Sequence, residues 1–307
     1  MVRGSAISAV ILICVFYTPG SLADQPLPVV LRGSLSLSDL PQGVQKRISP
    51  QMTREQIANM LRQQPSVTLQ GATLTLQPPA DERSIALAFD RVVLQDGSKV
   101  VTNGVNLELV AAQLSSDEGE ITAFSAESIV PNPAPQRQDG VAGLNAGTVV
   151  LDTTLGPNKL FVRLNGMPGQ PGGPGAPGPT GAPGTRGGDA ADHLLDCAHG
   201  GGDGGPGAKG GTGGSGGKGG PGGSGGKLIL EGPVASQRLL IDFVARGGQG
   251  GAGGSGGDGG QGGPGGDGGS GSTYCRGGRA GPTGPLGDPG PLGGPGQPGH
   301  DGSITAQ

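Results

Sequence analysis

Apolar and polar side chains alternate in short runs between residues 24 and 165, which is the pattern of strands with one buried face. Such runs occupy residues 67–70, 72–77 and 85–94, and Gly, Pro or Asp-Gly residues bound them. Short strands at close spacing are typical of a β-solenoid or a sandwich. The pattern leaves both architectures open, and we favour the solenoid.

One helix is expected to interrupt these strands. Thr53 is followed three residues later by Gln56, which is the spacing of an N-terminal capping box. Ile57 and Leu61 then lie on one face of a helical turn, and Pro65 marks the end of the segment. The sequence therefore predicts a short amphipathic helix after Thr53.

A strand–turn–strand pattern also occurs twice, and a glycine-rich tract follows it each time. The first copy covers residues 147–165, and the second forms a strand pair at 228–246. Residues 303–307 look like the start of the same strand once more. The recurrence indicates an internal repeat that links the two halves of the chain.

Glycine recurs at every third position between Gly166 and Gly302. Four tracts carry this period, and they cover residues 166–189, 201–227, 247–273 and 281–302. The two middle tracts read Gly-Gly-X, whereas the outer two carry many prolines. A polyproline-II-type chain has three residues per turn, so it places every third side chain on one edge. Bare glycine edges let neighbouring chains approach closely enough for their amides to form hydrogen bonds.

Three other interpretations of the glycine period compete with a bundle. A flexible linker is common for Gly/Ser-rich sequence, but it would not keep one period over four tracts of matched length. A collagen triple helix relies on imino acids, which the middle tracts largely lack, although a short local trimer stays open. A calcium-binding nonapeptide roll requires an apolar residue where this chain has Gly260.

The tracts are expected to alternate in direction, because the first leaves the β-rich domain and the second returns to the strand pair. Each would be about 70–85 Å long at ~3.1 Å per residue. The predicted fold class is mainly β plus polyglycine-II. In it, an N-terminal β-solenoid or sandwich (24–165) carries a four-tract antiparallel bundle of polyproline-II-type, glycine-rich helices (166–302).

The two spacers at the far end of such a bundle, 190–200 and 274–280, hold Cys197 and Cys275. In an oxidising compartment a disulfide is the expected state of this pair. The bundle model brings the two cysteines together although it is derived from glycine spacing alone.

The first spacer offers a second interpretation, a metal site at the tip. Its carboxylate, imidazole and thiol groups are suitable ligands, and they belong to Asp192, His193, Asp196, Cys197 and His199. Export and the presence of Cys275 favour a disulfide, so we predict no metal ion and no cofactor. Leu194 and Leu195 would then pack beneath the bridge.

Charged side chains predict the register of the two middle tracts. Lys209 and Lys218 are as far apart in the sequence as Asp258 and Asp267. In an antiparallel pair, Lys218 lies level with Asp258 when Lys209 lies level with Asp267. Exposed pairs of this kind would fix register more than stability, and solvated, unpaired charges remain the alternative.

Small side chains also form a candidate surface row on these two tracts. The row consists of Thr212, Ser215, Ser224, Ala252, Ser255 and Ser270. A flat and regularly spaced surface of small groups would suit ice, although Lys and Asp interrupt the row.

Residues 1–23 have the pattern of a secretory signal peptide. Arg3 precedes an apolar run, and Ser21-Leu22-Ala23 provides small residues for cleavage. The run is too short to span a bilayer, and no other segment is apolar enough. A net charge of -4 without a basic patch argues against a nucleic-acid partner. We therefore expect an extracellular or cell-envelope protein.

No catalytic constellation is found. His193, His199 and His300 all lie outside the β-rich domain, so that domain cannot hold a Ser-His-Asp or Cys-His arrangement. Acidic residues such as Glu108 are scattered and are expected at the surface. The sequence predicts that the protein is not an enzyme.

The Gly-Gly-X period of residues 166–302 resembles the polyglycine-II helix bundle proteins, both those like the snow flea antifreeze protein and those like phage fibre-tip adhesins. Bacterial collagen-like secreted proteins are looser relatives. The signal peptide departs from the phage proteins, and the β-rich domain departs from the antifreeze protein. The resemblance rests on the glycine period and carries no binding motif with it.

These features predict a secreted, non-enzymatic structural or adhesive surface protein with an unidentified cell-surface, glycan or matrix ligand. An ice-binding protein and a collagen-like trimeric matrix protein are the alternatives. An enzyme that acts on polysaccharide would rest on fold analogy alone.

Overall fold

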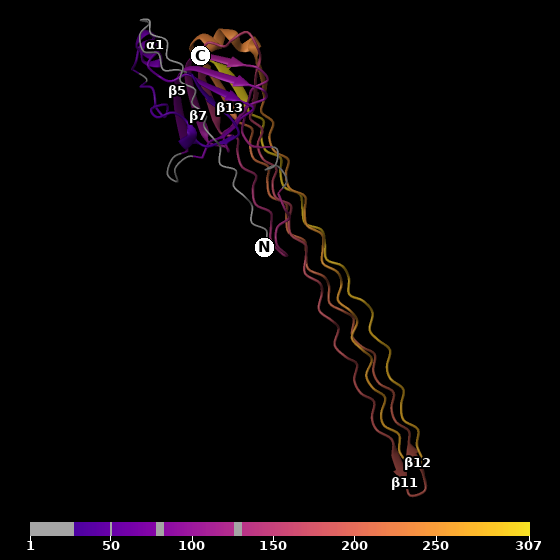
Figure 1. Ribbon diagram of the computed structural model, residues 1–307. Coiled ribbons are helices and arrows are strands. Elements are labelled where there is room, and N and C mark those ends of the chain that lie inside the picture. Colours follow the sequence, from indigo (N-terminus) through magenta and orange to yellow (C-terminus); the bar gives the residue numbers. More distant parts are fainter. Residues whose placement is uncertain (1–27, 50, 78–82, 126–130) are drawn as a thin grey trace.

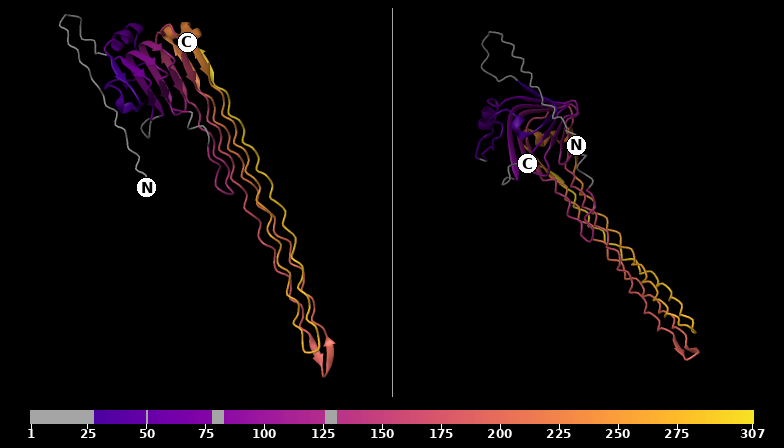
Figure 2. Two further views of the ribbon diagram at one scale, coloured as in Figure 1. Left: turned by 45° about the vertical axis from the view of Figure 1, so that its right-hand side comes forward. Right: turned by 60° about the horizontal axis from the view of Figure 1, so that its bottom comes forward.

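The computed structural model describes residues 28–49, 51–77, 83–125 and 131–307. A β-rich base lies at one end, and a long rod of extended glycine-rich tracts projects from it (Figure 1). The chain ends on the base, and a small hairpin forms the far end of the rod (Figure 2). The predicted signal peptide lies outside the described residues.

The base contains two sheets in which all strands run parallel. The larger sheet has seven strands in the order β1-β3-β5-β7-β9-β13-β15, and the smaller has six in the order β14-β10-β8-β6-β4-β2. The strands of the larger sheet are Val29–Leu31, Val67–Gln70, Ser84–Gln95, Asn106–Ser116, Thr148–Asp152, Lys227–Glu231 and Ser303–Ala306. Those of the smaller sheet, from β2 to β14, are Ser34–Leu35, Thr73–Thr75, Lys99–Val101, Glu120–Thr122, Leu160–Arg163 and Ile241–Val244.

The hydrophobic core lies between the two sheets. Strand β3 alternates buried and half-buried residues, and so does β9, because successive side chains of a strand point to opposite faces. Leu69 and Leu151 of the larger sheet and Ile121 and Leu160 of the smaller sheet belong to one buried cluster. In strands such as β3 and β9, the alternation in the sequence therefore correctly indicated one buried face.

This architecture corrects the predicted fold class. The fold is mainly β, with two parallel sheets of seven and six strands, and not an N-terminal solenoid or sandwich that carries a bundle of glycine-rich helices. The sheets do not end at residue 165, because β13 pairs in parallel with β9, and β15 with β13. Leu228 and Leu230 of β13 are fully buried in the same core as Leu151. The repeat that the sequence presented as a separate strand pair is a continuation of both sheets.

Helices occupy little of the described chain. Helix α1 covers Arg54–Leu61 and has the predicted capping box, in which the Gln56 N–H donates to Thr53 Oγ1 and the Thr53 N–H donates to Gln56 Oε1. Two 3-10 helices, η1 (Leu37–Asp39) and η3 (Gly232–Leu240), connect strands. Among the described residues, no helix has the length and apolarity needed to cross a membrane.

The four glycine tracts run side by side and hold one another through backbone hydrogen bonds (Figure 1). We number them tract 1 (166–189), tract 2 (201–227), tract 3 (247–273) and tract 4 (281–302). Tract 2 bonds to tracts 1, 3 and 4, and tract 3 bonds to tracts 1, 2 and 4. No backbone hydrogen bond joins tract 1 to tract 4 in the described chain. Tracts 2 and 3 are therefore central, and tracts 1 and 4 are peripheral.

This arrangement explains why the central tracts read Gly-Gly-X. A Cβ added to Gly256 would collide with the Gly290 carbonyl of tract 4, and one added to Gly257 would collide with the Ala176 carbonyl of tract 1. Tract 3 thus needs two glycines in every triplet, and tract 2 has them in every triplet except the one that contains Ala208. A peripheral tract has one packed position per triplet, occupied for example by Gly287. Its other two positions accept proline wherever no partner needs an N–H, which holds along tract 4 and along tract 1 beyond Gly173.

A short additional segment, which was not predicted from the sequence, lies along the base end of the rod. Residues 131–137 run outward beside tract 1, and residues 138–146 return between tracts 1 and 2. The Gly140 N–H donates to the Lys218 carbonyl at 2.8 Å. The signal was available, because Gly140, Gly143 and Ala146 continue the three-residue period of small residues.

Asp and Asn side chains provide acceptors for N–H groups that the tracts leave without a backbone partner. In each case the side-chain oxygen accepts from an N–H on a neighbouring segment, at 2.7–2.8 Å. The acceptor–donor pairs are Asp139–Lys218, Asn145–Ser224, Asn165–Arg246, Asp189–Ser270, Asp203–Arg279 and Asp301–Gly247. Most of them lie where a tract begins or ends, so they fix the entry and exit of the chain.

Candidate functional site

The far end of the rod is a two-stranded antiparallel hairpin. Strand β11 (Ala191–His193) pairs with β12 (Asp196–His199), and Leu194 and Leu195 form the turn between them. Leu194 adopts a φ of 48°, which lies in the left-handed region that a leucine rarely occupies. The turn therefore holds a bulky apolar residue in a conformation that glycine or asparagine adopts more easily.

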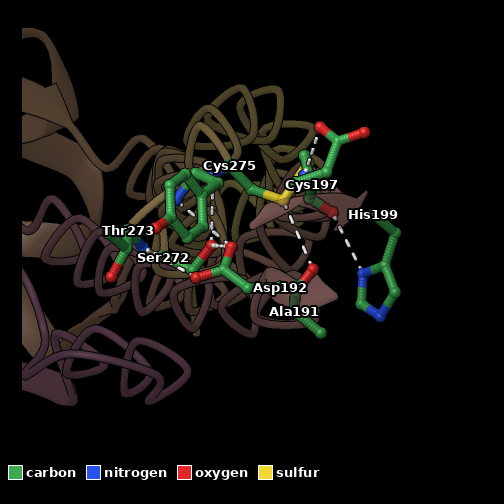
Figure 3. Close-up of a disulfide and its surroundings, with 10 residues drawn as sticks. Ala191, Asp192, Cys197, His199, Ser272, Thr273 and Cys275 are labelled. Atoms are coloured by element: carbon green, nitrogen blue, oxygen red, sulfur yellow. Dashed lines mark hydrogen bonds between the residues drawn. A yellow bond between two sulfur atoms is a disulfide. The ribbon is translucent and has the colours of Figure 1, made fainter. Parts of the chain in front are cut away.

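A disulfide closes this tip. Cys197 of β12 is bonded to Cys275, which lies in the turn between tracts 3 and 4, 78 residues further along the chain (Figure 3). The Cys275 side chain is buried, and its Sγ lies 3.3 Å from the Ala191 carbonyl oxygen. The bridge therefore joins the hairpin between tracts 1 and 2 to the turn between tracts 3 and 4.

The Asp192 carboxylate adds a second connection between the same two turns. It accepts hydrogen bonds from the Ser272 hydroxyl, from the Thr273 N–H at 3.1 Å and from the Tyr274 N–H at 3.2 Å (Figure 3). The Ser272 hydroxyl oxygen in turn accepts from the Cys275 N–H at 3.1 Å. These bonds order the turn in which Cys275 sits.

Leu194 and Leu195 do not pack beneath the disulfide, and this corrects the sequence-based expectation. Their exposed fractions are 88% and 79%. The hairpin has only two strands, and all residues from 191 to 200 are exposed, so no apolar surface is available to cover them. The structure thus presents two adjacent leucines to solvent at the point furthest from the base.

Three of the possible metal ligands of the tip make other contacts. The Cys197 sulfur belongs to the disulfide, and Asp192 accepts three hydrogen bonds. His199 Nδ1 lies 3.4 Å from the Gly200 carbonyl oxygen. Within the described ranges, no three His, Cys, Asp or Glu side chains are grouped as a metal site.

The two predicted register pairs are not formed. Tract 3 runs antiparallel to tract 2, but Asp258 lies beside Gly213 and not beside Lys218. Lys209 forms an ion pair with Asp288 of tract 4 and not with Asp267. The register follows from backbone hydrogen bonds between glycines, and the charged side chains adapt to it.

The candidate surface row is divided between two faces of the rod. Its members are exposed except for Ser224, which is half-buried, and the exposed ones are Thr212, Ser215, Ala252, Ser255 and Ser270. Because tracts 2 and 3 pack against each other and against both peripheral tracts, their X positions face opposite sides. The small residues therefore do not form one flat surface.

A charged cavity of about 480 Å³ lies beside α1, against the outer face of the larger sheet. Its charged lining residues are Arg47, Arg54, Glu108, Asp152 and Glu231. Arg54 Nη1 donates to Asp152 Oδ1 at 2.7 Å. Burial raises the pKa of Glu108, and the charges of Glu231 and Asp152 add to this effect, whereas Arg47 opposes it. The sequence predicted Glu108 to be an ordinary surface residue. It lines this cavity because strands far apart in the sequence, β7, β9 and β13, assemble it.

Comparisons with known proteins provide no further identification. No protein-family model matches the sequence. No curated protein matches it either. The resemblance to polyglycine-II bundle proteins therefore rests on the glycine period.

Proposed function

We propose that this protein is a secreted, non-enzymatic surface protein with an adhesive role, in which the rod holds the tip hairpin away from the base. Leu194 and Leu195 are the contact residues in this proposal. The observation that carries it is the high exposure of both leucines at the closed end of the rod.

Two adjacent exposed leucines are costly in water unless a partner covers them. Burying one large aliphatic side chain contributes about 1.5–3 kcal/mol. Single exposed apolar residues are common on protein surfaces and need no explanation, whereas neighbouring ones mark contact sites more often. Here they share one turn, and the left-handed Leu194 holds that turn in an uncommon conformation.

The rod supports this role because it limits the movement of the tip. Backbone hydrogen bonds connect each tract to at least two others along its length, and the disulfide ties the distal turns together. A binding element that is already ordered loses less conformational entropy when it binds. A disulfide is also compatible with an oxidising, extracellular location.

The chemistry of the tip favours a protein partner with an apolar pocket. Leucine side chains offer no hydrogen bonds, so they match a hydrophobic pocket better than the hydroxyl groups of a neutral glycan. Asp196 lies next to Leu195, so a partner with a basic rim would be complementary.

The test is a binding assay of residues 24–307, fluorescently labelled, on intact cells and on immobilised matrix proteins. We expect the double variant Leu194→Ser/Leu195→Ser to lose binding. The matched control is Leu286→Ser/Leu292→Ser, which changes two exposed leucines on the side of the rod.

Equal binding by the tip variant and the native protein would refute the proposal. Thermal hysteresis above a buffer control, retained in the tip variant, would instead favour the alternative of ice binding.

A further inference from the structure

A groove of about 810 Å³ crosses the outer face of the smaller sheet, at the end of the base from which the rod projects. Side chains from five neighbouring strands line it, from β2 through β4, β6 and β8 to β10. Because neighbouring strands of a sheet lie about 4.8 Å apart, the groove covers about 19 Å across them. Gly166 and Met167, the first residues of tract 1, line its side toward the rod. A groove of this length can hold several units of a polymer.

Polar side chains recur in this groove at every strand spacing. One row consists of Ser34, Thr73, Lys99 and Glu120, which parallel pairing places side by side on β2, β4, β6 and β8. The next residue along β4 is Leu74, which is buried in the core between the sheets. Since successive side chains of a strand point to opposite faces, the row lies on the outer face. A ligand in the groove therefore meets one new polar group on each strand that it crosses.

Three hydroxyl groups in the groove are available to a ligand. They belong to Ser34, Thr73 and Thr75, and within the described ranges their side chains form no hydrogen bond. Ser34 is exposed, and the two threonines are half-buried. A hydroxyl group both donates and accepts hydrogen bonds. These groups therefore match a ligand that itself carries hydroxyl groups.

The charged side chains of the groove are compensated in pairs. Lys99 Nζ lies 3.4 Å from Glu120 Oε2. Arg163 Nη1 lies 2.9 Å from Oδ1 of Asp242, which belongs to the neighbouring strand β14. An anionic or cationic polymer would have to compete with these pairs for a counter-charge. The groove is thus complementary to a neutral ligand with many hydrogen-bonding groups.

We propose that this groove binds a neutral polysaccharide in an extended, β-linked form, with its sugar units placed on successive strands. The rise of one sugar unit in such a chain is close to one strand spacing, so each unit meets the polar side chain of the next strand. A peptide fits less well, because an extended peptide advances about 3.4 Å per residue and falls out of step with the strands. The backbone groups of these strands are also already used in the sheet.

This site is separate from the tip and goes beyond the adhesive role of Leu194 and Leu195. The groove belongs to the base, whereas the tip hairpin lies at the opposite end of the rod (Figure 1). A polysaccharide bound at the base leaves the tip free for its own partner. The two sites can therefore be tested independently.

The probes are four neutral hexasaccharides with β-1,4 linkages: cellohexaose, mannohexaose, xylohexaose and N-acetylchitohexaose. Maltohexaose is the control probe, because its α-1,4 linkages make the chain coil. Each is titrated into residues 24–307, with the disulfide intact, by isothermal titration calorimetry, and NMR of isotope-labelled protein locates the site. We expect at least one β-1,4 probe to bind and to shift the amide signals of Thr73, Thr75 and Lys99. The signal of Thr68, on the larger sheet, should stay unchanged.

A pair of threonine variants makes the test specific. Thr73→Val/Thr75→Val removes two free hydroxyl groups and keeps the branched shape that strands favour. We expect it to weaken binding about tenfold, because each hydroxyl group loses its hydrogen bonds to the sugar. The matched control is Thr68→Val/Thr148→Val, which changes two half-buried threonines on the outer face of the larger sheet. This control should bind as the native protein does.

Circular dichroism and thermal unfolding establish that each variant is folded, and the NMR map of the native protein needs no variant. Failure of all four β-1,4 probes to bind would overturn the proposal, and so would unchanged affinity of Thr73→Val/Thr75→Val. Stronger binding of hexagalacturonic acid or of a chitosan hexamer would also overturn it, because the ligand would then be charged. The tip variant Leu194→Ser/Leu195→Ser should bind the hexasaccharide normally, so a failure at the tip is distinguishable from a failure at the base.

Discussion

Lys209 of tract 2 and Asp288 of tract 4 form an ion pair with 2.6 Å between Nζ and Oδ2. The two tracts run in the same direction, and their backbones are already joined at this level by the bond from the Gly210 N–H to the Pro285 carbonyl at 3.0 Å. The charged side chains extend beyond this backbone contact, and both remain largely exposed to solvent.

We therefore expect Lys209→Ala to change the free energy of unfolding by less than about 1 kcal/mol, because exposed ion pairs gain little over hydration. Urea denaturation of the native protein and the variant measures this difference. A loss of several kcal/mol would mean that side-chain charge, and not the backbone, sets the register.

Glycine positions inside the rod should be far less tolerant. A Cβ at Gly257 would lie well under 3.0 Å from the Ala176 carbonyl oxygen, which is a backbone atom and cannot rotate away as a flexible side chain could. We expect Gly257→Ala to destabilise the rod by more than about 2 kcal/mol. The matched control is Gly294→Ala in tract 4, where an added Cβ meets nothing within 4 Å. Thermal unfolding should separate the two, and similar melting temperatures would contradict the packing described above.

The register of the tracts could not be predicted from the sequence for a physical reason. Every Gly-Gly-X triplet presents the same backbone groups, so shifting one tract by a triplet restores the same hydrogen bonds. The choice between such registers depends on the base, where β10 pairs with β14 and β9 with β13. Parallel pairing between strands about 80 residues apart leaves no local signal, and the predicted pairing of Lys218 with Asp258 failed for this reason.

Local signals were more reliable. The capping box at Thr53 was predicted correctly, because it depends on residues only three apart. The sheets were assigned too short an extent, because the strands of the second half join them through distant parallel partners. The exposure of Leu194 and Leu195 was also missed, since apolar residues are usually covered and nothing in the sequence showed that this turn lacks neighbours.

The disulfide should control the order of the tip and not that of the base. Cys197→Ser/Cys275→Ser removes a bridge between residues 78 apart, which in small domains typically costs about 2–5 kcal/mol. We expect faster hydrogen exchange in residues 191–200 and 272–278, with exchange in β5 and β7 unchanged. Mass spectrometry of deuterated peptides, with and without reductant, measures this. Equal protection of the tip with and without the bridge would show that the Asp192 hydrogen bonds are sufficient.

Acid should loosen the distal end of tract 1 through Asp189. The Ser270 N–H donates to its carboxylate at 2.7 Å, and this bond holds the pKa of Asp189 below its ordinary value, with a smaller contribution from Arg186. Because the folded-state pKa is lowered, the stabilisation is present above the unfolded pKa of about 4 and is lost as the pH falls through the folded-state value. The Ser270 amide should therefore lose protection at low pH. Its hydrogen exchange should become faster relative to the exchange rate of an unprotected amide at the same pH.

Asp189→Asn isolates this effect, because an amide oxygen still accepts the Ser270 N–H, as Asn145 and Asn165 do for other segments. The variant should keep the protection of Ser270 at low pH, where the native protein loses it. If both proteins lose protection at the same pH, the transition belongs to another carboxyl group.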